Sequence, residues 1–107
     1  MSEWTFLTNH ALVLSVIANN PRSTAFDISQ RVGITERSTR KIIADLDEDG
    51  YIDKKKQGRR VRYRINSDLS LRSDTHRGIV IGDFLESLGW NERKRSISKD
   101  RAQSEIK

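Results

Sequence analysis

Residues 60–65 alternate strictly between an arginine and an apolar side chain. A period of two places the apolar side chains on one face of a β-strand and the arginines on the other. The segment 51–56 before it ends in three lysines, and Gln57-Gly58-Arg59 between the two segments supplies a tight turn. The pattern predicts a β-hairpin over 51–65, with Val61, Tyr63 and Ile65 facing the core and Arg60, Arg62 and Arg64 on the opposite, cationic face.

The same hairpin holds the densest run of positive charge in the chain. The 107 residues include 20 Lys plus Arg and 15 Asp plus Glu, a net charge of +5. Residues 54–64 contain seven basic side chains and no acidic one. A local field of this strength attracts polyanions, nucleic acid first. Lysines on an edge strand also prevent stray strand pairing, so the charge alone leaves both interpretations open.

Composition excludes several other classes of protein. Hydrophobic residues make up 35% of the chain and charged residues 33%, which suits one small domain that gains apolar contact by dimerising. The absence of cysteine excludes disulfides and thiolate metal sites. No apolar run approaches the roughly 18–20 residues of a membrane span. The N-terminus lacks the pattern of a signal peptide, so we expect a soluble, cytoplasmic protein with no membrane partner.

The first expected helix follows Thr8 or Asn9, either of which can cap it, and ends before Pro21. Its sequence is apolar on nearly every side, which is typical of a helix covered on more than one side. We therefore expect it at the centre of the domain, with some of its surface available to a second subunit. Three residues just before it are expected to add to the same core: Trp4, Phe6 and Leu7.

A second and a third helix flank Gly33, where a tight turn needs a positive φ angle. The second is expected over 25–31, after Ser23-Thr24. The third is expected over 35–49, beginning at the capping residue Thr35, with Gly50 closing it. The expected buried positions are Phe26, Ile28 and Val32 in the second helix, and Ile42, Ile43 and Leu46 in the third.

A last helix is expected over 75–88, capped by Asp74 or Thr75. Ile81, Phe84, Leu85 and Leu88 follow the i, i+3, i+4, i+7 spacing of one helix face. Gly82 inside this helix costs about 1 kcal/mol relative to alanine, which indicates close packing against another helix. Leu69 and Leu71 can anchor the preceding connection, 66–73. We expect residues 1–90 to form one domain and the basic segment 91–107 to be a flexible tail.

The order of helix, helix, tight turn, helix and basic hairpin over residues 8–66 resembles the winged helix-turn-helix of bacterial and archaeal transcription regulators, especially the MarR-like and ArsR-like groups. Gly33, Leu46, Gly50 and Gly58-Arg59-Arg60 all fall where these families place them. The resemblance implies an α+β, mainly α fold with a two-stranded basic wing and a C-terminal dimerisation helix. The metal-ligand set of the metal-sensing ArsR members is absent.

A helix over 35–49 with basic first turns fits the major groove of B-DNA, where its N-terminal residues meet base edges. We expect Arg37, Ser38 and Arg40 to read bases and Thr35 and Lys41 to contact phosphates. Arg59 and Arg60 at the wing tip would enter the minor groove or clamp phosphates, and Lys55, Lys56 and Arg62 would contact phosphates.

Other polar residues in this region favour structural roles. Thr39 is expected to be buried against the second helix, and Glu36 suits the helix dipole better than contact with a cytosine. For Lys54 and Arg64, an ion pair with Asp45 or Asp53 is at least as well supported as a DNA contact. His10 and His76 lie on different segments without metal-ligand spacing, so we expect no metal site and no cofactor.

These observations predict a sequence-specific double-stranded DNA-binding transcriptional regulator, acting as a homodimer with half-sites about 10 bp apart. An effector, if there is one, would sit between the wing domain and the dimer helices. Alternatives are a winged-helix module that binds protein and a nucleic-acid binder without sequence preference. An enzyme is not expected, because the chain has no phosphate-binding Gly-rich loop and no nucleophile beside a base. The expected dimer interface includes Leu12, Val16, Ile81, Phe84, Leu85 and Leu88.

Overall fold

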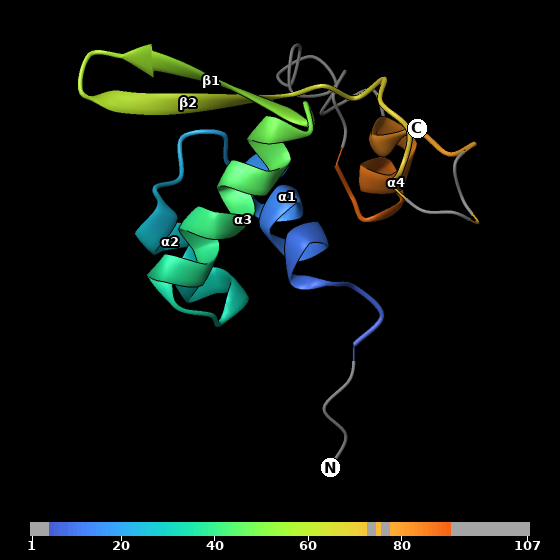
Figure 1. The fold of residues 1–107 in the computed structure, drawn as a ribbon, viewed down its shortest axis with the longest axis horizontal. Helices are drawn as coiled ribbons and strands as arrows, with labels where there is room; N and C mark the ends of the chain where they lie inside the picture. The colour runs from blue at the N-terminus through green and yellow to red at the C-terminus, as the bar shows by residue number, and fades with distance from the viewer. Residues whose placement is uncertain (1–4, 73–74, 76–77, 91–107) are drawn as a thin grey trace, which may run out of the picture.

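The computed structural model describes residues 5–72, 75 and 78–90. Within these residues, helices and a two-stranded antiparallel sheet follow one another along the chain (Figure 1). Trp4, Asp74, His76 and the tail 91–107, about which the sequence led to predictions, lie outside the described residues. The elements are α1 (Asn9–Asn19), α2 (Ala25–Val32), α3 (Glu36–Glu48), β1 (Ile52–Gln57), β2 (Arg60–Ile65) and α4 (Ile81–Ser87).

A threonine caps each of the first three helices. In every case its Oγ1 accepts a hydrogen bond from the backbone N–H three residues later, which satisfies one of the donors that a helix start leaves unpaired. Asp27 also accepts the N–H of Thr24 at 3.2 Å, which completes a capping box at the start of α2. The three capping bonds are Thr8–Ala11 (3.1 Å), Thr24–Asp27 (3.0 Å) and Thr35–Ser38 (3.0 Å).

Two glycines end helices in the left-handed region, as the sequence predicted. Gly33 has φ +88° and its N–H donates to the carbonyl of Ser29 at 2.8 Å, which ends α2 and turns the chain into α3. Gly50 has φ +87° directly after α3. Residues with a Cβ rarely adopt this conformation, so Gly33 fixes the turn between α2 and α3 and Gly50 fixes the end of α3.

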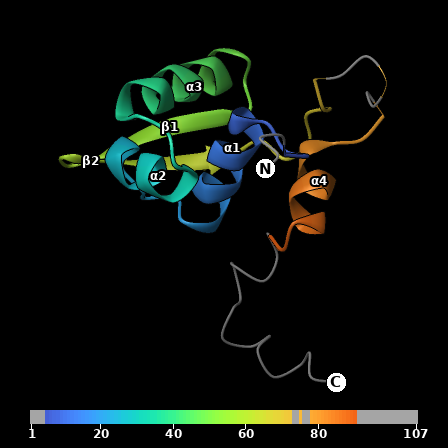
Figure 2. The same ribbon diagram turned by 90° about the horizontal axis from the view of Figure 1, so that it is seen from below.

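Helices α1, α2 and α3 contact one another around the core, and α1 also contacts β2 (Figure 2). Val13 and Ile17 of α1 and Ile28 of α2 are fully buried at the centre of this cluster. The central position predicted for α1 is confirmed. The buried apolar set is Val13, Leu14, Ile17, Ala18, Ile28, Ile42, Ile43, Leu46, Ile52, Ile81, Leu85 and Trp90.

The hairpin of β1 and β2 has the predicted turn at Gly58 and the predicted alternation. The apolar residues of β2 are half-buried and its arginines are exposed. The backbone N–H of Tyr63 donates to the carbonyl of Pro21 at 2.9 Å, which ties β2 to the loop between α1 and α2. The pairing runs Ile52–Ile65, Asp53–Arg64, Lys54–Tyr63, Lys55–Arg62, Lys56–Val61 and Gln57–Arg60.

The core positions predicted for two aromatic residues are wrong. Phe26 is 55% exposed, because it lies two residues from the fully buried Ile28 and a helix turns about 200° over that interval. Phe6 is 90% exposed, since it precedes α1 where the chain leads away from the helical core (Figure 1).

The last helix begins at Ile81 rather than at residue 75, which corrects its predicted start. The residues before it pair as extended chain with the connection after the wing: Leu71 N–H donates to Ile79 (2.7 Å) and Ile81 N–H to Leu69 (2.6 Å). The run Ile79-Val80-Ile81 is β-branched throughout, which favours extended pairing over a helical turn. Helix α4 therefore stands beside the bundle of α1, α2 and α3 (Figure 2).

Gly82 permits a close approach, but to a different element from the one predicted. A Cβ at this position would lie 2.9 Å from the Cβ of Ser67 and 3.1 Å from its carbonyl oxygen. The Gly82 N–H donates to that same carbonyl at 2.9 Å. The glycine therefore fits α4 against the connection that follows β2, not against another helix.

Candidate nucleic-acid interface

Helix α3 has one buried face and one polar, exposed face. The buried face consists of Thr39, Ile42, Ile43 and Leu46. Thr39 is fully buried and its hydroxyl donates to the carbonyl of Thr35 at 3.0 Å, which confirms the burial predicted for it. The residues of this helix that were predicted to contact DNA all lie on the exposed side of its first two turns or at its cap: Thr35, Arg37, Ser38, Arg40 and Lys41.

Two of these side chains already have partners within α3. Thr35 Oγ1 accepts the N–H of Ser38, which leaves the hydroxyl proton of Thr35 available to an outside acceptor. The guanidinium of Arg40 donates to the carboxylate of Glu36, one helical turn earlier. Glu36 therefore interacts with the residue predicted to read a base, besides lying where a carboxylate favours the helix dipole.

The predicted wing residues are all exposed. In the register of the hairpin Lys55 lies directly opposite Arg62. Like charges at opposed positions of an antiparallel pair destabilise the sheet. A bound polyanion would relieve this repulsion. The pairing therefore agrees with the attraction for polyanions that the charge pattern of the sequence predicts. The exposed wing residues are Lys55, Lys56, Arg59, Arg60 and Arg62.

At the base of the wing, Arg64 and Lys54 lie beside carboxylates. Arg64 donates to Asp53 at 3.2 Å, one of the ion pairs the sequence favoured. Lys54 Nζ lies 3.9 Å from Asp47, so its carboxylate neighbour belongs to the end of α3 and is neither Asp45 nor Asp53. The contact between Lys54 and Asp47 joins the wing to the third helix, whereas the pair of Arg64 and Asp53 lies within the wing.

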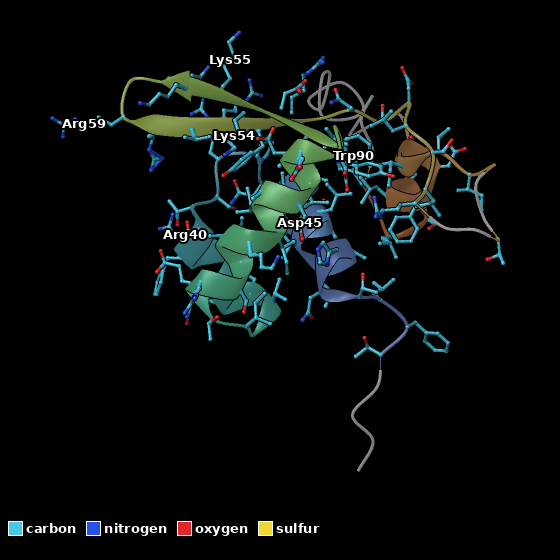
Figure 3. All side chains as sticks on the ribbon, in the orientation of Figure 1. Arg40, Asp45, Lys54, Lys55, Arg59 and Trp90 are labelled. Atoms are coloured by element: carbon cyan, nitrogen blue, oxygen red, sulfur yellow. The ribbon has the colours of Figure 1, made fainter. Side chains whose placement is uncertain are left out.

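A cavity of about 490 Å³ lies between the start of α2, α3 and the wing. Five cations line it, and they come from three separate parts of the chain: Arg22, Arg40, Lys54, Arg59 and Arg60. Arg40 and Arg59 lie on the side of the molecule away from Trp90 and α4 (Figure 3). Burial raises the pKa of Tyr63, which also lines this cavity, while the nearby Arg40 charge acts in the opposite direction.

The structure adds Arg22 and Ser23 to the predicted site. Arg22 is exposed just before α2, and Ser23 beside it is buried. Their signal in the sequence is weak, because residues 1–34 carry no net charge and Arg22 is one of two cations there. Among the predicted residues, Arg40, Arg59 and Arg60 share the cavity lining, whereas Arg37, Ser38, Lys41, Lys55, Lys56 and Arg62 lie outside it.

On the other side of α3, His10 and Asp45 join α1 to this helix. His10 Nε2 lies 2.8 Å from Asp45 Oδ2. The hydrogen bond from His10 holds the pKa of Asp45 below its usual value of 3.8, with smaller contributions from the charges of Lys41 and Arg72, while burial acts in the opposite direction. In the described part of the chain, no group of three or more His, Cys, Asp and Glu is placed to hold a metal ion.

The six residues predicted for a dimer interface differ in their exposure. Ile81 and Leu85 are 4% and 1% exposed, so the core of this chain already covers them. Leu88 is 39% exposed at the end of α4, and the other three are half-buried: Leu12, Val16 and Phe84. No helix within the described ranges is long and apolar enough to cross a membrane.

Comparison with known proteins agrees with this architecture. Residues 8–53 match a family model described as winged helix-turn-helix DNA-binding. Among solved structures, the chain is similar to one described as the predicted DNA-binding transcriptional regulator from E. coli, with a TM-score of 0.52 and 18% identity, over 72% of this chain and 70% of that chain. No curated protein matches the sequence significantly. The predicted fold class, a mainly helical winged helix-turn-helix, is confirmed.

Proposed function

We propose that this chain is a sequence-specific regulator of transcription that binds double-stranded DNA. In this proposal α3 lies in the major groove, where Arg37, Ser38 and Arg40 meet base edges. Thr35 and Lys41 contact phosphates, and the wing rests on the adjacent backbone or minor groove. The similar E. coli protein, described as a predicted DNA-binding transcriptional regulator, supports the same class of function.

One observation carries the proposal. Three exposed cations from α3 and the tip of the wing line the same cavity: Arg40, Arg59 and Arg60. Arg40 and Arg59 lie on the same side of the molecule, away from Trp90 (Figure 3). A helix of this diameter fills the major groove, which is about 12 Å wide, so a hairpin beside it lies over the neighbouring sugar-phosphate backbone. Convergent cations on a helix and an adjoining wing suit this two-part contact.

We also propose that the regulator acts in the cytoplasm as a homodimer on a pseudo-palindromic site. Leu88 and Phe84 of α4 would contact the second copy together with Leu12 and Val16 of α1, since these four keep some exposed surface in the single chain. Two copies would place their α3 helices about one turn of DNA, or roughly 34 Å, apart. Within the winged helix-turn-helix class, the glycines and the Gly58-Arg59-Arg60 tip favour the MarR-like or ArsR-like groups.

Sequence selection tests this function directly. The full chain is incubated with a random duplex library, and bound duplexes are recovered and sequenced over several rounds. Enrichment of one motif is expected. Arg37→Ala is expected to relax the preference at one base position, and Lys41→Ala to weaken binding to all sequences alike. Binding without any enriched motif would contradict sequence specificity. No binding at low salt would contradict DNA as the partner and favour a protein-binding winged helix.

A further inference from the structure

Ser23 holds a buried hydroxyl with no internal partner. Ser23 is 3% exposed, and its Oγ has no hydrogen-bond partner in the part of the chain that the structure describes. The Ser23 backbone is fixed by the hydrogen bond from its N–H to the carbonyl of Asn20 at 3.0 Å. A buried hydroxyl without a hydrogen bond is unfavourable, so native structures rarely keep one without a ligand or water.

Ser23 lies immediately before the start of α2. The capping box uses the N–H of Thr24, which donates to Asp27, and the N–H of Asp27, which donates to Thr24. The backbone N–H groups of Ala25 and Phe26 also lie at the helix start. Helix geometry supplies no carbonyl acceptor for N–H groups in the first turn. Such N–H groups, with the positive end of the helix dipole, favour an anion.

The cavity that Ser23, Thr24 and Ala25 line is also strongly cationic. Arg22, Arg40, Lys54, Arg59 and Arg60 line the same space. Asp27 is not among its lining residues, although its carboxylate at the helix start offsets part of the dipole. The hydrogen bond from Tyr63 to Pro21 holds the wing wall against the loop that contains Ser23. The buried hydroxyl, the helix start and the arginines therefore meet at one place.

We propose that this cavity is a specific site for a phosphate group, held by the Ser23 hydroxyl and the first N–H groups of α2 and neutralised by Arg22, Arg40 and Arg60. Its volume of about 490 Å³ admits a phosphate together with the ester group that carries it. The phosphate belongs either to the DNA backbone or to a small phosphorylated molecule that competes with DNA. The first case rests on the proposed function, and the second does not.

Amide NMR spectra of the full chain test the site. Sodium pyrophosphate and a mixed-sequence duplex are titrated separately, and the amides of Ser23, Ala25 and Phe26 are followed. At least one of the two titrants is expected to shift these amides. Ser23→Ala is expected to weaken the binding of that titrant roughly tenfold, because one hydrogen bond to a charged group is lost. Ser15→Ala on α1, outside the cavity, serves as the matched control, and thermal melts confirm that both variants fold.

A second pair of variants keeps the test independent of the hydroxyl. Arg22→Ala removes an exposed cation just before α2 and Arg31→Ala removes one in its last turn, but only Arg22 lines the cavity. Arg22→Ala is expected to lower the affinity for the titrant at least fivefold more than Arg31→Ala does. Shifts with pyrophosphate, and displacement of duplex by it, assign the site to a small phosphorylated ligand. Shifts with duplex alone assign it to the DNA backbone.

The inference and the proposed function fail in different ways. Duplex that binds while the amides of Ser23, Ala25 and Phe26 stay in place, with Ser23→Ala and Arg22→Ala equal to their controls, overturns the phosphate site and leaves DNA binding intact. Pyrophosphate that shifts these amides in a chain that binds no duplex supports the site and overturns the proposed function.

Discussion

The guanidinium of Arg40 donates to the carboxylate of Glu36, one turn earlier on the exposed face of α3. Arg40 also lines the cationic cavity between this helix and the wing. A cation that is paired in the free protein leaves its partner before it contacts DNA, and an exposed pair at this spacing contributes about 0.3–0.5 kcal/mol. Under the proposed function, Glu36 is therefore expected to oppose DNA binding both through this pair and through repulsion of phosphates.

Glu36→Gln is expected to raise the affinity for duplex DNA by about three- to tenfold, because it frees Arg40 and removes a charge beside the phosphates. Fluorescence anisotropy at fixed salt measures the change. Glu48→Gln is the control, since it removes the same charge from the exposed far end of α3. Equal effects of the two variants would show that the Arg40 pair plays no part.

Gly82→Ala is expected to lower the stability of the chain by about 1–3 kcal/mol, the usual range for overpacking. The added methyl group would lie 2.9 Å from the Cβ of Ser67 and 3.1 Å from its carbonyl oxygen. In an open helix the same change would stabilise the protein. Thermal unfolding measures the difference, with Gly78→Ala as the control because a Cβ there meets nothing within 4 Å. A rise in Tm for Gly82→Ala would contradict the packing described for α4.

Asp45→Asn is expected to reduce the decrease in the free energy of unfolding that the wild type shows as the pH falls. His10 holds the pKa of Asp45 below 3.8, so the folded state binds this proton less readily than the unfolded state does. The resulting stabilisation is present above the unfolded pKa and disappears as the pH falls through the lower folded value. Urea unfolding from pH 7 to pH 2 measures it.

In that experiment the variant is expected to be less stable than the wild type at neutral pH and to approach it in acid. Asp68→Asn, which alters an exposed carboxylate in the connection after β2, provides the control. Parallel pH profiles for Asp45→Asn and the wild type would contradict a role for the pair with His10.

Leu88→Glu is expected to convert a dimer into a monomer. Leu88 is 39% exposed at the end of α4, and a buried carboxylate at an interface is strongly unfavourable. Sedimentation equilibrium reports the mass directly. Leu69→Glu introduces the same group at a residue of similar exposure, 37%, outside the proposed interface. A wild-type chain that sediments as a monomer at high concentration would exclude the homodimer.

Local patterns in the sequence predict most of the fold. The threonine caps and the glycines at 33 and 50 mark the helix ends, because capping and positive φ depend on one residue and its near neighbours. The alternation over 60–65 predicts the inner face of the wing for the same reason. The buried face of α3 follows from the spacing of Ile42, Ile43 and Leu46, and the structure confirms all of these.

The failures lie where distant segments decide the outcome. Residues 79–81 pair with the connection 69–71, and no local window reveals that this pairing replaces the first turns of a helix. The partner of Gly82 is Ser67 for the same reason. In the short helix α2, Phe26 and Ile28 cannot both face the core, and their sequence spacing alone does not say which residue is buried.

The candidate site also contains residues that the sequence predicts and residues that only the folded chain brings to it. The exposed cations of α3 and the wing are visible as charge patterns, so the sequence predicts them residue by residue. The cavity depends on a tertiary contact, the hydrogen bond from Tyr63 to Pro21 that brings the wing to the loop before α2. Arg22 and Ser23 therefore become part of the site only in the folded chain.

The most direct test of the account is the salt dependence of duplex binding by the wing variant. Fluorescence anisotropy of the wild-type chain, Arg59→Ala/Arg60→Ala and the charge-matched Arg31→Ala/Arg72→Ala is measured from about 50 to 300 mM salt. The slope of log K against log salt falls by about 0.9 for each phosphate that the protein no longer neutralises. The wing variant is therefore expected to show a slope smaller by about 1.8, and the control a slope close to that of the wild type. Equal slopes for the two variants, or no salt-dependent binding by the wild type, would contradict a DNA-binding wing.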